Sequence, residues 1–270
     1  MPPIAILAAT SGHSGVDRVI GNLVRQFSAW GLAVDLLQVR NHGPNLSAED
    51  LPGVRFVDLG AAHVNTAFPA LVRYLRRERP RALLTDKDKV NRMAIFARAL
   101  ARTDTRLAVR IGTTVSVNLA SRGGFERWLQ SRSMGRLYPM ADRVIVPSCG
   151  AADDLAQYTG LSRGHIQVVA SPILTPDLVR RAAEPVEHPW LGDPACPLVL
   201  GVGELSYRKD FETLLHAFAL VRRERRCRLI ILGRGRRREA LTALADELGV
   251  AEDLDLPGFH PNPIGFMARA

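Results

Sequence analysis

Residues 198–221, LVLGVGELSYRKDFETLLHAFALV, have the pattern of a buried strand, a glycine-bounded loop and an amphipathic helix. The run Leu198–Val202 is apolar throughout, which is typical of a strand covered on both faces of a parallel sheet. After the loop, apolar residues recur at helical spacing from Phe211 to Val221 and would lie on one face. A strand that passes directly into a helix is the repeating unit of an α/β fold.

Lys209 stands at the end of this loop, in a chain that uses arginine at almost every basic position. The other lysines are Lys87 and Lys89, whereas lysine and arginine together number 36. An ammonium group is a compact charge suited to phosphate at a helix start, and it opposes the helix macrodipole unless an anion is nearby. The residues alone leave two interpretations open: a phosphate ligand, or a solvated side chain at the start of a helix.

The same alternation of strand and helix fills the rest of the chain. In the first part we predict strands at 4–9, 33–39, 54–57, 82–85, 106–111 and 143–147, and helices at 16–30, 66–77, 90–101 and 125–138. In the second part we predict strands at 198–202, 228–232 and 254–256, and helices at 211–222 and 237–248. Strands that alternate with helices form parallel sheets covered on both faces, so the predicted fold class is α/β with two Rossmann-like domains.

A proline-rich segment separates the two parts. Residues 171–197 contain six prolines, a density typical of a connector between domains. We therefore predict a first domain at 1–172, a connector at 173–196 with a short helix at 177–183, and a second domain at 197–270.

Composition narrows the class of protein. With 47% hydrophobic residues in 270, the chain can bury a sizeable core, and its net charge of +9 indicates an anionic partner: nucleic acid, a membrane surface or a phosphorylated substrate. Cys149, Cys196 and Cys227 have no spacing of a disulfide framework or a zinc site. No segment has the length and apolarity of a signal or a membrane span. We expect a cytoplasmic protein that does not cross a membrane.

Two glycine-bearing loops follow predicted strands. Ligands of parallel sheets bind at the carboxyl ends of strands, where helix N-termini favour anions. In the first loop, residues 10–17, Gly12 and Gly15 would let the backbone approach a ligand closely, and His13 lies beside them. The second loop is 203–209.

Several motifs together resemble a known family. Residues 198–221, RLIILGRGRRREALTALADELGV (228–250) and DLPGFHPNP (255–263) are similar to the start of the donor domain of retaining GT-B glycosyltransferases of family 4 (GT4). GHSGVDRVIGNLVRQFSAWGLAVDLL (12–37) and ADRVIVPSCGAADDL (141–155) resemble the first domain of that family. The resemblance extends over nearly the whole chain, and the order and spacing of the motifs make it specific.

The resemblance implies an enzyme that moves a sugar from a nucleotide-diphosphate sugar to a hydroxyl acceptor with retention, in glycan, lipopolysaccharide or glycolipid biosynthesis. It implies no cofactor and no metal, because fixed positive groups would stabilise the leaving diphosphate. The expected partners are a nucleotide sugar and a glycan or lipid-linked sugar, without nucleic acid. Peripheral contact with the anionic inner face of the cell membrane is a further expectation. Arg73, Arg76 and Arg77 are most simply a solvated helix face, with a membrane-facing surface as the alternative.

The resemblance also assigns donor-site residues. Lys209 would stabilise the leaving diphosphate as the catalytic group, assisted by backbone at Gly12 and Gly15. The family usually has arginine five positions before this lysine, whereas this chain has Glu204, a reversed charge for which Arg208 could compensate.

The remaining assignments concern the nucleobase, the acceptor and the end of the chain. Backbone at Gly258, Phe259 and His260 would contact the nucleobase, and His13, Gly112 and Thr113 would lie on the acceptor side, where many members have a histidine that this chain lacks. The family continues beyond the motif at 262–270 into a segment with two donor-binding glutamates. We therefore expect an incomplete second domain of GT-B type, first half only, with the 198–202 strand unpaired on one side and the chain as given inactive.

Three alternatives stay open on the sequence. The chain could be a non-catalytic GT-B-like binding module or inactive fragment, which Glu204 and the absent histidine favour. It could be a nucleotide-sugar epimerase of the same architecture. Asp86-Lys-Asp88 and Asp253-Leu-Asp255 have the spacing of carboxylates that hold a metal-bound nucleotide, although charged loop ends commonly look like this.

Overall fold

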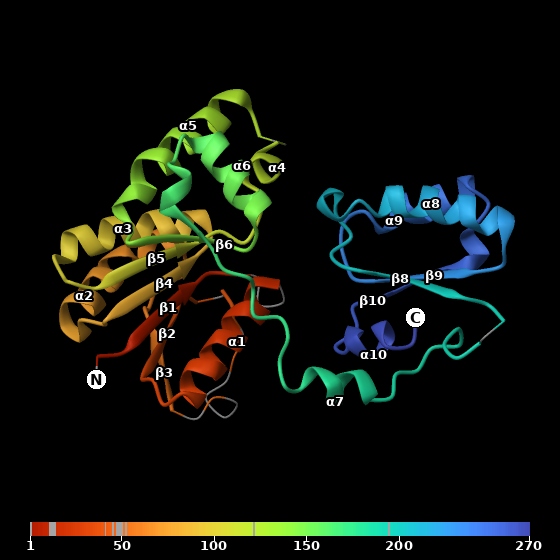
Figure 1. Ribbon diagram of the computed structural model, residues 1–270, viewed down its shortest axis with the longest axis horizontal. Helices are drawn as coiled ribbons and strands as arrows, with labels where there is room; N and C mark the ends of the chain where they lie inside the picture. The colour runs from red at the N-terminus through yellow and green to blue at the C-terminus, as the bar shows by residue number, and fades with distance from the viewer. Residues whose placement is uncertain are drawn as a thin grey trace. The chain divides into compact units, whose positions relative to one another are not determined.

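The computed structural model describes residues 2–10, 15–40, 42–44, 46, 51, 53–120, 122–193 and 195–270. Contacts divide the chain into two compact units, Met1–Ile173 and Leu174–Ala270. Each unit is built on one parallel sheet (Figure 1). The predicted α/β class with two Rossmann-like units is therefore confirmed.

The sheet of the first unit has seven parallel strands in the order β3-β2-β1-β4-β5-β6-β7. Their bounds are β1 Ile4–Ala8, β2 Val34–Gln38, β3 Val54–Asp58, β4 Ala82–Asp86, β5 Arg106–Arg110, β6 Arg143–Val146 and β7 Ile166–Val168. Six of them lie within one residue of the predicted ranges. The prediction missed β7, which has three residues, of which Ile166 alone is buried.

Helices cover both faces of this sheet. They are α1 Gly15–Ala29, α2 Phe68–Glu78, α3 Asp88–Ala101, α4 Val115–Leu119, α5 Gly124–Leu137 and α6 Cys149–Thr159. On one face, α2, α3, α5 and α6 form the larger core cluster with sheet residues such as Leu7 and Leu83. On the other face, α1 packs against Ile6 and Leu36, because successive side chains of a strand point to opposite faces.

The second unit has a three-stranded parallel sheet in the order β10-β9-β8. Its strands are β8 Leu198–Val202, β9 Arg228–Leu232 and β10 Leu254–Gly258, and its helices are α7 Leu178–Ala183, α8 Phe211–Glu224, α9 Arg238–Glu247 and α10 Pro263–Met267. Within the described residues β8 has a neighbour on one side only, as predicted. Across the described parts of both units, no helix has both the length and the apolar character needed to cross a bilayer.

Two different layers cover the faces of the smaller sheet (Figure 1). Helices α8 and α9 bury Leu215, Phe218 and Leu241 on one face. On the opposite face, Phe266 of α10 packs with Trp190 from the proline-rich segment. Residues 186–191 of the predicted connector therefore take part in the core of the second unit.

The contact between α5 and α6 in the first unit requires a glycine. A Cβ atom at Gly135 would lie 2.3 Å from the backbone oxygen of Thr159, whereas one at Gly150 of α6 would meet nothing within 4 Å. We expect Gly135→Ala to lower the free energy of unfolding by about 1–3 kcal/mol, because the helices must move apart. The matched control Gly150→Ala should raise it by about 0.5–1 kcal/mol, since alanine favours a helix. Denaturant unfolding measures both, and equal effects would contradict the packing described.

Candidate functional site

The loops after β8, β9 and β10 meet at the carboxyl edge of the second sheet. The amide of Gly203 donates to the carbonyl of Leu232 at 2.9 Å, and the amide of Gly233 donates to the carbonyl of Gly258 at 2.8 Å. These bonds bring the predicted donor residues 204–209 and 258–260 to one edge of one unit. We call this arrangement the glycine edge.

Glycine is required where these loops touch. Gly233 has φ +153°, and a Cβ atom there would lie 1.7 Å from the carbonyl oxygen of Gly203. A Cβ atom at Gly235 would lie 2.2 Å from the carbonyl oxygen of Leu205. The sequence interpretation of Gly233-Arg-Gly235 as a tight turn between strand and helix is therefore confirmed.

Lys209 ends a short 3₁₀ turn, Tyr207–Lys209, immediately before α8. The next residue, Asp210, has φ +50° and caps α8 by accepting hydrogen bonds from the amide and hydroxyl of Thr213. Because this carboxylate already complements the helix N-terminus, the lysine is not needed for capping and does not face an uncompensated dipole.

The side chain of Lys209 lies over Gly203. A Cβ atom at Gly203 would be 3.0 Å from Cε of Lys209, so the absence of a side chain at Gly203 leaves room for the lysine methylenes. Lys209 is exposed, and no described residue forms an ion pair or hydrogen bond with its ammonium group. The structure therefore presents an unpaired cation at the glycine edge.

Glu204, the residue of reversed charge, has a partner. Its Oε2 lies 2.8 Å from the guanidinium of Arg208, and each side chain is more than half exposed. An exposed pair of this kind contributes at most about 1 kcal/mol. The carboxylate at 204 is thus neutralised within the loop by a contact that an incoming anion could replace.

Arg237 supports the 3₁₀ turn and was not recognised from the sequence. Its guanidinium lies 4.2 Å from the ring centre of Tyr207 and donates to the tyrosine hydroxyl at 2.8 Å. It also forms an ion pair with Glu212 of α8. Thirty residues separate Tyr207 and Arg237 in the chain, so no local spacing signals their contact.

The segment after β10 is shaped by its own contacts. Gly258 has φ +93°, a conformation that favours glycine. His260 accepts a hydrogen bond from the amide of Asn262 through Nδ1 at 3.1 Å, and its ring packs edge-on against Phe266. Phe259 is about half exposed. The His260 ring is therefore fixed by Asn262 and Phe266 of the same unit. The part of segment 258–260 that we consider a candidate for ligand binding is its backbone.

In the first unit, Gly15 lies at the carboxyl edge of the sheet. It begins α1, and a Cβ atom there would meet nothing within 4 Å. Thr10 pairs with Gly43 in an antiparallel bridge, and its hydroxyl donates to buried Asp17 of α1. Gly12 and His13 lie outside the described residues.

Gly112 and Thr113 follow β5, above a buried ion pair. Arg110 binds Asp86 at the end of β4, and their side chains are 7% and 1% exposed. A Cβ atom at Gly112 would lie 3.0 Å from this guanidinium, so glycine lets the loop cross over it. Burial raises the pKa of the Asp86 carboxyl, an effect that the charge of Arg110 opposes.

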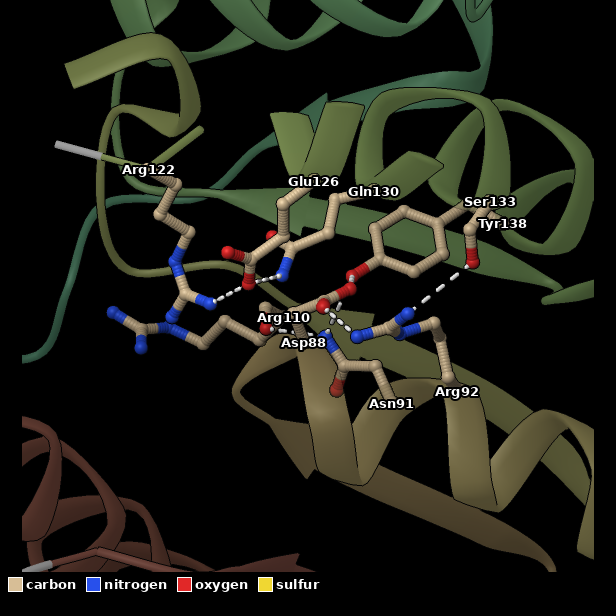
Figure 2. Close-up of polar contacts among 9 residues, drawn as sticks. All are labelled: Asp88, Asn91, Arg92, Arg110, Arg122, Glu126, Gln130, Ser133 and Tyr138. Atoms are coloured by element: carbon tan, nitrogen blue, oxygen red, sulfur yellow. Dashed lines mark hydrogen bonds and ion pairs between the residues drawn. The ribbon is translucent and has the colours of Figure 1, made fainter. Parts of the chain in front are cut away.

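A polar network lies beside this pair (Figure 2). Asp88 accepts from the hydroxyl of Tyr138 at 2.9 Å and pairs with Arg92 at 2.6 Å. Asn91 donates to the carbonyl of Arg110 at 2.9 Å, which ties α3 to β5. Burial raises the pKa of Asp88, and the charge of Arg92 opposes this effect.

These contacts bear on the metal interpretation of the two Asp-x-Asp motifs. Asp86 and Asp88 have the partners just described, Asp253 pairs with Arg222 at 2.6 Å, and Asp255 pairs with His188 at 2.8 Å. Within the described ranges, no three His, Cys, Asp or Glu side chains gather as metal ligands would. The four carboxylates serve as partners in ion pairs and hydrogen bonds.

Asp154 of α6 holds the loop that contains Gly112 and Thr113. Its carboxylate accepts from the amides of Val115 at 2.8 Å and Ser116 at 3.1 Å, and from the Ser116 hydroxyl. These bonds satisfy amides at the start of α4. The sequence shows no cap for α4 because the cap comes from 39 residues further along the chain.

Comparisons with known proteins identify the family. The model of the glycosyl transferase 4-like domain matches residues 14–172, and that of glycosyl transferases group 1 matches residues 192–270. The chain belongs to the GT4 glycosyltransferases. A Campylobacter jejuni relative of this GT4 chain, N-acetylgalactosamine-N,N'-diacetylbacillosaminyl-diphospho-undecaprenol 4-alpha-N-acetylgalactosaminyltransferase, is 30% identical over 182 residues. The match covers 67% of this chain and 47% of the relative.

Solved structures share the fold of the GT4 chain. Anabaena Alr3699/HepE, in complex with UDP and glucose, has a TM-score of 0.72 at 15% identity, covering 99% of this chain and 72% of its own. The lipopolysaccharide outer core galactosyltransferase WaaB has a TM-score of 0.62 at 18% identity, covering 97% and 69%. The fold is accordingly of GT-B type, as the resemblance implied.

The capping role of Asp154 can be tested directly. We expect Asp154→Ala to remove about 1–2 kcal/mol of local stability, because two amides lose their acceptor. Hydrogen exchange at Val115 and Ser116 should then be roughly tenfold faster or more. The neighbouring Asp153, which pairs with Arg163 at 2.7 Å, supplies the control Asp153→Ala. Unchanged exchange at Val115 in Asp154→Ala would contradict the assignment.

Proposed function

We propose that this GT4 chain transfers a sugar from a nucleotide-diphosphate sugar to a hydroxyl group of a glycan or lipid-linked sugar, with retention of anomeric configuration. The observation that carries the proposal is the exposed ammonium group of Lys209 at the glycine edge, which has no partner among the described residues. Related proteins support it: HepE was solved with UDP and glucose, and the Campylobacter jejuni relative is named for a diphospho-undecaprenol-linked acceptor.

In this proposal the donor diphosphate lies against Lys209. As the bond from sugar to diphosphate breaks, negative charge grows on the leaving group, and a preorganised ammonium stabilises it without a metal ion or cofactor. Backbone at 258–260 of the same unit contacts the nucleobase. The Glu204–Arg208 pair at 2.8 Å lies in the same loop and sets the charge around the diphosphate.

The acceptor belongs to the first unit in this account. The loop at Gly112 and Thr113 lies over the Asp86–Arg110 pair and is fixed by Asp154, so it offers a rigid surface beside the carboxyl ends of β4 and β5. A lipid-linked acceptor would require peripheral contact with the inner face of the membrane, and nucleic acid plays no part. The relatives named as transferases favour transfer over a nucleotide-sugar epimerase or a non-catalytic module. Turnover of a labelled nucleotide sugar without acceptor would instead support the epimerase.

The role of Lys209 predicts a loss of nucleotide affinity on its removal. We expect Lys209→Ala to weaken UDP binding by about 1.5–3 kcal/mol, the range for a charge-assisted hydrogen bond, while leaving the fold intact. The control Arg223→Ala removes the same charge from the exposed C-terminal turn of α8 and should have little effect. Titration calorimetry measures both. Equal affinity of Lys209→Ala and wild type would refute the assignment.

The pair at Glu204 predicts a gain of affinity. Glu204→Gln removes a negative charge and releases Arg208, so UDP should bind up to about fivefold more tightly, the scale of an exposed ion pair. If the gain comes from released Arg208, it should be lost in an Arg208→Ala background, whereas a gain that comes from the removed negative charge should persist there. Calorimetry on the four proteins of this cycle tests the coupling. Weaker binding by Glu204→Gln would mean that this carboxylate supports the nucleotide site.

A further inference from the structure

The first half of α5 projects from the core of the first unit. Every residue from Gly124 to Leu129 is exposed. Phe125, Trp128 and Leu129 are 75%, 57% and 51% exposed, and the two aromatic rings stack with centroids 6.1 Å apart. Large apolar side chains gathered on a surface in this way mark an interaction site. We call these three residues the apolar tip.

The second half of α5 anchors the helix firmly. The hydroxyl of Ser131 donates to the carbonyl of Tyr158 at 2.6 Å, and Met134 is buried. Gly135 brings the helix backbone close to Thr159. A helix fixed along its second half holds the apolar tip in a defined position on the surface.

The polar side of the projecting half is satisfied locally. Glu126 binds Arg122, and the amide of Gln130 donates to the same carboxylate at 3.4 Å (Figure 2). Glu126 is the acidic residue of α5, so its charge is already neutralised. The apolar tip therefore has no free carboxylate of its own helix beside it to repel an anionic surface.

Unpaired arginines continue the exposed face behind the apolar tip. Arg132 and Arg136 follow Phe125 by seven and eleven positions, close to whole turns of a helix, whereas Arg127 is two positions from Phe125 and lies on the other side of the helix. All three are exposed, and none has an ion-pair partner among the described residues. One face thus combines aromatic and leucine side chains with two free cations, Arg132 and Arg136.

We propose that α5 docks this chain on an anionic phospholipid bilayer. The apolar tip would enter the boundary between headgroups and acyl chains, where tryptophan is favoured, and Arg132 and Arg136 would contact lipid phosphates. An anionic bilayer offers an apolar interior for the apolar tip and negative charges for the arginines. Attraction to an anionic surface also agrees with the chain's net charge of +9. The inference rests on the proposed function in one respect, the lipid-linked acceptor. Docking through α5 would bring the loop at 112–113, which precedes α5 in the chain, close to an acceptor in the membrane.

The arginines that the sequence suggested for membrane contact lie on α2, and two of them have partners within the chain. Arg76 of α2 donates to the carbonyl of Leu100 at 2.9 Å, and Arg77 lies 3.3 Å from a carboxylate oxygen of Glu78. Together with Arg73 they line a hollow of about 640 Å³ between α2 and α3. This surface also has arginines but no exposed aromatic tip, which makes it a matched control.

Vesicle cosedimentation tests the charge component. Wild type should bind vesicles of phosphatidylglycerol and phosphatidylcholine, and added salt should weaken binding. Replacing Arg132 and Arg136 by glutamate should lower the partition coefficient by about 25-fold or more, since each basic group near the surface contributes about fivefold. The control with Arg73 and Arg77 replaced by glutamate carries the same charge change and should retain most of the binding. The reverse ranking, or no binding by wild type, would overturn the proposal.

Tryptophan fluorescence tests the apolar component. The chain has three tryptophans, so Trp30→Phe with Trp190→Phe leaves Trp128 as the reporter. Its emission should shift to the blue on anionic vesicles and be quenched by brominated lipid. Trp30 is 65% exposed immediately after α1, and a variant that keeps Trp30 and replaces Trp128 and Trp190 by Phe should show neither response. Circular dichroism checks that each variant is folded.

These measurements need no sugar donor, so they separate docking from transfer. Absence of vesicle binding by the wild type, together with transfer to a water-soluble acceptor, would overturn docking alone, whereas docking without transfer would count against the proposed function. Self-association of the chain that Trp128→Ser abolishes, together with an unresponsive Trp128 on vesicles, would show that a second copy covers the apolar tip and would overturn the proposal.

Discussion

The close approach of two glycine backbones is the constraint on which the second unit depends. With 1.7 Å between a Cβ position at Gly233 and the carbonyl oxygen of Gly203, any side chain there would separate the loops after β8 and β9. Gly203 in turn leaves space for the methylenes of Lys209. One pair of glycines thus sets the spacing of the strand ends and the course of the lysine side chain. A cation held over backbone, beside a helix that has its own cap, is available to a ligand.

In the first unit, ion pairs fix the loops at the carboxyl edge of the sheet. There, polar side chains are paired: Asp86 with Arg110, both buried beneath Gly112, and partly buried Asp88 with Arg92 and Tyr138. Removing one partner of such a pair strands a buried charge, so these contacts hold the loop ends rigidly in place. The second unit shapes its edge by backbone proximity, and the first shapes its edge by ion pairs that support the loops from below.

Periodicity in the sequence predicted the long elements and their order, because apolar runs such as Leu198–Val202 and helical spacing from Phe211 directly reflect burial. It missed α4 and α10, whose five residues are too few for a period to appear, and it also missed the 11-residue helix α6. The position of Lys209 pointed to the glycine edge, and Arg208 was a candidate to compensate the charge of Glu204 in the same loop, with which it forms an ion pair. Contacts between residues far apart in the chain, such as Asp154 with Val115, could not be predicted from local spacing. They arise from topology, which brings α6 beside the loop after β5.

The central claim is that the glycine edge receives the donor diphosphate, and hydrogen exchange with and without UDP tests it most directly. UDP should slow exchange at 203–210, 233–235 and 258–260, where the loops after β8, β9 and β10 meet, and this protection should be lost in Lys209→Ala at the same concentration of UDP. Protection by UDP that leaves these three loops unchanged and appears elsewhere in the chain would contradict the account.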